Sequence, residues 1–207
     1  MKSLIINGCL NHIKKNNSYS KEMLEKIEYS LTGLYLTFSK IIIILIISLV
    51  LGIFKETLIF MLLFNILRTT GCGLHASKSI TCLISSIVFF IGLPFLATIL
   101  NINFIIKLIL CIACMILLLI YAPADTKKKP MINRKRRMKL KFITFFFSII
   151  FSIFCLIIKN NYVSNCLLFS MILEAILILP ITYFLLKKPY KNYETYLKEH
   201  RELLKKV

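Results

Sequence analysis

The chain has 207 residues, of which 58% are hydrophobic and 17% are charged, and its mean hydropathy is +0.80. This composition excludes an ordinary soluble domain and is typical of an integral membrane protein. The net charge of +18 alone would suit a nucleic-acid-binding protein. The lysines and arginines, however, cluster beside apolar runs, so we expect them to face a lipid bilayer and no nucleic acid.

The chain begins with a segment, residues 1–33, that we expect to be amphipathic and to lie on the cytoplasmic membrane surface. Met23, Leu24, Ile27 and Leu31 recur at helical spacing, and Ser20 is a suitable N-cap for the helix that carries them.

Six apolar runs follow, and a membrane-spanning helix needs about 20 such residues. The second run is too short to span by itself, so both five and six crossings remain open. The sequence therefore predicts an all-α fold, a polytopic transmembrane helical bundle that forms a single domain over residues 1–207 with its membrane part over 34–186. The runs cover residues 34–54, 57–67, 79–100, 104–121, 142–158 and 163–186.

Basic residues indicate the orientation of this bundle. The stretch 127–141 holds nine lysines and arginines, and the tail 187–207 holds seven. Because cytoplasmic loops of membrane proteins are enriched in these residues, we expect the loop 122–141 and both termini in the cytoplasm.

The stretch RTTGCGLHASKSITC, residues 68–82, interrupts the apolar pattern and is the candidate catalytic loop. An imidazole beside a thiol makes a nucleophile near neutral pH, which suggests His75 and Cys82 as a dyad. In one continuous helix their Cα atoms would lie about 10 Å apart, so His75 is expected in a loop that folds back. Gly71 and Gly73 provide the freedom for that structural turn.

Other interpretations of this stretch remain open. Cys82 could serve only in helix packing, and Cys72 is a rival nucleophile. A metal site from Cys72, His75 and Cys82 is disfavoured because the spacing matches no usual zinc pattern, so we expect neither a metal nor another cofactor.

The order Arg68, Gly71, Gly73, His75, Ala76, Cys82 resembles the accessory gene regulator protein B (AgrB) family, membrane cysteine endopeptidases of bacterial quorum sensing. The stretch YAPADTKKKP, residues 121–130, resembles that family's cytoplasmic loop, and the overall length and hydropathy fit across nearly the whole chain. Cys72 departs from the family, which usually has glycine there.

The resemblance implies a bacterial cell-membrane enzyme that cleaves a short propeptide before its acidic C-terminal tail. Cys82 would be the nucleophile, His75 the general base, and the product a thiolactone formed through an acyl thioester. We expect the basic loop to attract the acidic tail and Arg68 to contact the substrate. Homodimerisation is plausible for the family. The expected substrate-binding residues are Arg68, Lys127, Lys128 and Lys129.

Two charged residues within apolar runs suggest a competing function. Glu174 and Lys107 could pair in a small transporter or channel in which His75 acts as a gate. Asp125 is a further candidate for a third catalytic residue that orients His75, although a local turn role after Pro123 is favoured.

Overall fold

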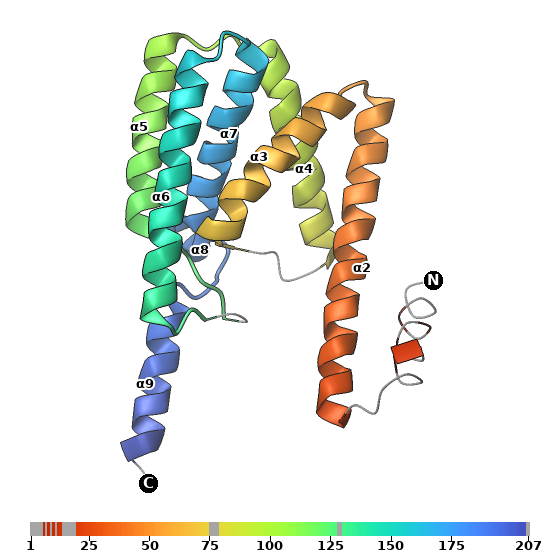
Figure 1. Ribbon diagram of the computed structural model, residues 1–207, viewed down its shortest axis with the longest axis vertical. Helices are drawn as coiled ribbons and strands as arrows, with labels where there is room; N and C mark the ends of the chain where they lie inside the picture. Colours follow the sequence, from red (N-terminus) through yellow and green to blue (C-terminus); the bar gives the residue numbers. More distant parts are fainter. Residues whose placement is uncertain are drawn as a thin grey trace. The chain divides into compact units, whose positions relative to one another are not determined.

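The structure, a computed structural model, describes residues 6, 8, 10, 12–13, 20–74, 79–127 and 130–205. Helices and short connections make up these ranges, which contain no β-strand (Figure 1). The chain divides into two compact units, residues 1–52 and 53–207, and each is described by itself. The predicted all-α class is confirmed.

The first unit contains helix α2 (Lys21–Val50). Ser20 caps it as expected, because its side-chain oxygen accepts a hydrogen bond from the backbone N–H of Met23 at 3.4 Å. No proline interrupts residues 21–50, so the helix runs through the expected boundary at residues 33 and 34. Residues 21–33 of the expected amphipathic segment and residues 34–50 of the first apolar run therefore form one 30-residue helix.

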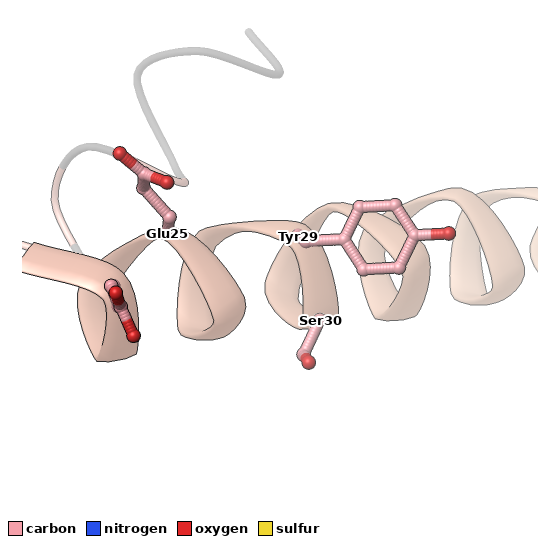
Figure 2. A pocket seen from close by; sticks show the side chains of 4 residues that line it. Glu25, Tyr29 and Ser30 are labelled. Carbon is pink, nitrogen blue, oxygen red and sulfur yellow. The ribbon is translucent and has the colours of Figure 1, made fainter. Parts of the chain in front are cut away.

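A shallow hollow lies along the polar first half of α2. Figure 2 shows Glu25, Tyr29 and Ser30 at this hollow, which Glu22 also lines. The hollow contains no residue of the motif at 68–82, and we assign it no role.

The second unit is a bundle around α7, which contacts α3, α4, α5 and α6. Leu168, Met171 and Ile178 of α7 are fully buried. In Figure 1, α3 crosses α7 obliquely, whereas α5 and α6 run alongside it. The helices of this unit are α3 (Phe54–Gly71), α4 (Ser79–Ile99), α5 (Phe104–Tyr121), α6 (Arg134–Ile157), α7 (Asn161–Ile178), α8 (Pro180–Leu185) and α9 (Asn192–Lys205).

Within the described ranges, five helices are long and apolar enough to cross a membrane, namely α2, α4, α5, α6 and α7. Helix α3 has 18 residues but includes Lys55, Glu56 and Arg68, which shorten its apolar part. The second apolar run, residues 57–67, thus lies within an oblique helix of the bundle.

Two further predicted boundaries differ from the structure. The stretch 122–141 is not a loop throughout, because α6 begins at Arg134, where Asn133 caps it by accepting from the N–H of Arg136 at 3.2 Å. The last apolar run, 163–186, is two helices, because Pro180 has no N–H to continue α7 and instead starts α8.

Polar side chains join the helices at the end of the bundle where α7 begins. The buried ammonium of Lys107 donates to the side-chain oxygens of Asn161 at 3.1 Å and Ser164 at 2.7 Å. Asn165 donates to the carbonyl of Leu100 at 2.7 Å. Hydrogen bonds to neutral side chains therefore stabilise the buried ammonium group of Lys107.

At the opposite end, the buried carboxylate of Asp125 holds the start of α9. Its oxygens accept from the backbone N–H of Asn192 at 2.9 Å and of Tyr193 at 2.7 Å, and the N–H of Met131 lies at 3.4 Å. The hydroxyl of Tyr183 donates to the Asp125 carbonyl at 2.9 Å. A residue 67 positions away thus caps the C-terminal helix.

We expect Asp125→Ala to release the first turn of α9, because the N–H groups of Asn192 and Tyr193 would lose their acceptor. A buried donor without an acceptor costs about 2 kcal/mol, so these two amides should exchange hydrogen about 30-fold faster. Hydrogen-exchange mass spectrometry measures this. Glu199→Ala, an exposed acid of the same helix, is the control and should leave exchange there unchanged.

Candidate functional site

The turn that follows α3 has an unusual backbone. Cys72 caps the helix with φ 60° and ψ −115°, and its N–H donates to the carbonyl of Arg68 at 3.1 Å. Gly73 follows with φ 88°. Residues other than glycine rarely adopt positive φ, so the backbone suits Gly73, whereas Cys72 is strained.

The segment after α5 pairs with this turn like a short strand. The N–H of Gly73 donates to the carbonyl of Ala124 at 2.9 Å, and the N–H of Ala124 donates to the carbonyl of Gly71 at 3.0 Å. The N–H of Leu74 donates to the carbonyl of Leu177, at the end of α7, at 3.2 Å. Two distant parts of the chain thus fix the backbone that leads to position 75.

A buried ion pair lies beneath the turn. Arg68 on α3 faces Glu174 on α7 with 3.5 Å between Nη1 and Oε2, and the side chains are 12% and 0% exposed. The guanidinium of Arg68 also donates to the carbonyls of Cys72 and Leu74. Arg68 therefore connects the buried acid to the turn. Its expected direct contact with a substrate stays a prediction.

Gly71 allows this arrangement because it has no side chain. A Cβ atom at this position would lie 2.5 Å from Oε1 of Glu174. The second glycine is equally enclosed, since a Cβ on Gly73 would lie 2.7 Å from Nη1 of Arg68 and 3.0 Å from the carbonyl oxygen of Leu177. Close packing thus favours glycine at both positions, and at Gly73 the positive φ favours it as well.

Cys82 is the fourth residue of α4 and is half-buried. Its carbonyl accepts from the hydroxyls of Ser85 at 3.2 Å and Ser86 at 2.7 Å. His75 lies outside the described residues, so the predicted pairing with Cys82 is untested. Among the basic candidates, Lys127 is described and exposed, whereas Lys128 and Lys129 lie outside the described residues.

The pairing of Glu174 with Lys107 that the competing transporter function would use does not occur in the structure. Glu174 pairs with Arg68, and Lys107 bonds to Asn161 and Ser164. Ser164 and Glu174 are ten residues apart on α7, which separates the two charges by about 15 Å along the helix axis. They cannot serve as the coupling pair of a transporter.

The other candidate assignments concern Asp125 and metal binding. Both carboxylate oxygens of Asp125 accept from backbone N–H groups, which favours its structural role in the turn. Within the described ranges, no group of three His, Cys, Asp or Glu side chains could hold a metal ion.

Sequence reasoning missed the partners that hold the turn, Glu174 and Ala124. Glu174 stands out in the sequence as a costly intramembrane charge, and Arg68 is the cation at the start of the motif. A buried carboxylate needs a cation, so this rule could have suggested the pair. Ala124 acts only through its backbone, and no residue type in the sequence signals that role.

We expect Gly71→Ala to destabilise the protein by about 1–3 kcal/mol, because the new methyl group displaces Glu174 from its ion pair. The matched control is Gly92→Ala within α4, where a Cβ meets nothing within 4 Å. That change should be neutral or stabilise by up to about 1 kcal/mol through helix propensity. Thermal unfolding in detergent compares the two, and equal melting temperatures would contradict the packing argument.

We expect Cys72→Gly to stabilise the protein by about 1 kcal/mol, because glycine adopts this positive φ without strain. Cys72→Ala keeps the side-chain constraint on φ and should give no such gain. The difference in melting temperature between the two variants measures the strain, and a lower value for the glycine variant would refute it.

Comparison with known proteins identifies the family. The model of the family described as Accessory gene regulator B matches residues 6–178. A putative AgrB-like protein of Clostridium acetobutylicum is 34% identical over 183 residues, which is 87% of this chain and 88% of that protein.

Similar values hold for two further relatives. The accessory gene regulator protein B of Staphylococcus aureus is 33% identical and covers 87% of this chain and 93% of its own length. A putative AgrB-like protein of Listeria innocua is 31% identical over 83% of this chain and 84% of its own. No solved structure matches. The chain is therefore a member of the accessory gene regulator B family of membrane proteins, which supports a role in accessory gene regulator quorum sensing.

Proposed function

We propose that the chain is a membrane cysteine endopeptidase that processes a quorum-sensing propeptide, with Cys82 as nucleophile and His75 as general base. One observation carries the proposal. Leu74, which directly precedes His75, is held at its N–H by Leu177 and at its carbonyl by Arg68. A base that follows a fixed residue is restricted in the positions it can reach, and such preorganisation favours catalysis.

The position of Cys82 supports the same proposal. It lies four residues into α4 and is partly exposed, unlike the buried Cys111, Cys114, Cys155 and Cys166 of the spans. Those four behave as small hydrophobic side chains in the core. A nucleophile needs access to its substrate, and Cys82 has more of it than they do.

The proposed reaction proceeds in two acyl transfers. His75 accepts the thiol proton as Cys82 Sγ attacks the carbonyl carbon before the acidic tail, and the C–N bond then breaks while His75 protonates the leaving amine. The acyl group remains on Cys82 as a thioester. A cysteine thiol of the substrate then attacks this thioester, closes the thiolactone ring and returns the proton to the Cys82 sulfur. Exclusion of water from the site would protect the thioester.

The charge distribution supports capture of an acidic substrate and a cytoplasmic site. The end of the bundle that carries the 71–74 turn also carries the exposed Lys127 and the basic start of α6. Positive charge raises the capture rate of an acidic tail, and the positive-inside rule favours this end in the cytoplasm. We include Lys127, Lys128 and Lys129 as substrate-binding residues and a homodimer as the assembly. We also include both termini as cytoplasmic, which requires that the oblique α3 crosses the bilayer as a sixth helix beside the five long apolar ones.

The proposal predicts the behaviour of four variants in cells that also make the cognate propeptide. Cys82→Ala, Cys82→Ser and His75→Ala should reduce tail cleavage at least about 10³-fold, because each removes a member of the dyad. Cys72→Ala should retain cleavage. Mass spectrometry of the propeptide measures the products, and immunoblotting controls for protein level.

A thioester adduct trapped on Cys82 would establish the intermediate. Continued cleavage by Cys82→Ala would refute the assignment of the nucleophile. Loss of cleavage only in Cys72→Ala would transfer that role to Cys72.

A further inference from the structure

A hollow of about 240 Å³ lies where α5 ends, α6 begins and the chain leads into α9. The lining residues are Ile120 and Tyr121 of α5, Arg134, Arg137, Met138 and Lys141 of α6, residues 122–125 between them, and Tyr190, Lys191 and Tyr193 of the third segment. A hollow of this volume has room for a small anionic group.

The hollow is strongly cationic. Arg134, Arg137, Lys141 and Lys191 line it. Among the described lining residues the only acid is Asp125, whose oxygens are engaged by backbone N–H groups. Glu194 lies beside the hollow and pairs with Lys191 at 3.3 Å, so Arg134, Arg137 and Lys141 carry the positive charge of the hollow. The lining therefore favours a ligand with negative charge.

Parts of this lining are preorganised. The guanidinium of Arg137 lies 3.8 Å from the centre of the Tyr193 ring and donates to the carbonyl of Met131 at 2.6 Å. Burial raises the pKa of Tyr190 above its ordinary value, so its hydroxyl stays protonated and able to donate a hydrogen bond. Fixed donors lose little entropy when an anion binds.

The hollow also lies at the boundary between polar and apolar surface. Tyr121 is the last residue of one apolar span, and Lys141 lies two turns into another. Apolar side chains beside it are exposed, with Ile120 at 56%, Met138 at 46% and Phe142 at 63%. Tyrosine and basic side chains at the end of a span are typical of the headgroup level of a bilayer.

We propose that this hollow binds the phosphate of an anionic phospholipid, with Arg134 and Lys141 contacting the phosphate and Ile120 and Met138 contacting the start of the acyl chains. A soluble acidic peptide would match the charge but would gain little from the exposed apolar residues. A lipid uses both features of the site. This inference is independent of the proposed peptidase activity.

The test compares two double variants of the full-length protein purified in a neutral detergent. Arg134→Gln with Lys141→Gln removes two charges from the hollow, whereas Arg136→Gln with Lys139→Gln removes two exposed charges of the same helix that do not line it. Native mass spectrometry measures the affinity for phosphatidylglycerol and, as a zwitterionic comparison, phosphatidylcholine. Equal melting temperatures of the two variants control for folding.

We expect the first variant to lose about 30-fold in affinity for phosphatidylglycerol and the second to lose less than about threefold, since each basic contact with an anionic lipid contributes about fivefold. Equal losses in both variants would mean unspecific attraction and would overturn the proposal, as would no loss in either. Displacement of the lipid by equimolar inorganic phosphate, or by an equimolar hexaglutamate peptide, would also overturn it, because acyl chains would then contribute nothing.

Discussion

The buried ion pair between Arg68 and Glu174 is the constraint on which the candidate site depends. A carboxylate that is 0% exposed inside a membrane bundle needs a cation, and removal of one partner of such a pair costs about 3–5 kcal/mol. The cation comes from the last turn of α3, so the end of α3 must lie against α7. The remaining donors of Arg68 then reach the carbonyls of Cys72 and Leu74 and fix the path of the turn.

The two ends of the second unit satisfy their buried polar groups by different means. Lys107 lies among amide and hydroxyl side chains at one end, whereas the other end combines the ion pair with backbone pairing and the Asp125 cap. Ala124 and Asp125 are consecutive residues of the segment between α5 and α6. Through Asp125 this segment holds the start of α9, and through Ala124 it holds the turn before His75. The same segment therefore stabilises both the C-terminal helix and the candidate site.

Features that depend on local sequence could be predicted. Membrane class, the cap at Ser20 and the glycine turn each follow from neighbouring residue types. The early start of α6 could not be read from apolar runs, because its first turns are basic and only Asn133 marks the boundary. The partners of the motif were also out of reach, since Arg68 and Glu174 are 106 residues apart and Ala124 acts only through its backbone. Such pairings depend on how the helices pack, which residue type alone does not determine.

The close packing of Gly71 against Glu174 limits which residues this family can accept at the two positions. The Glu174 carboxylate occupies the volume that a side chain at position 71 would fill, so the two positions share one volume. A relative with alanine at position 71 would need a shorter acid, such as aspartate, at position 174, and would then have to bring its arginine nearer to α7. Gly71, Arg68 and Glu174 are therefore expected to change together in evolution as a single unit, although they are distant in sequence.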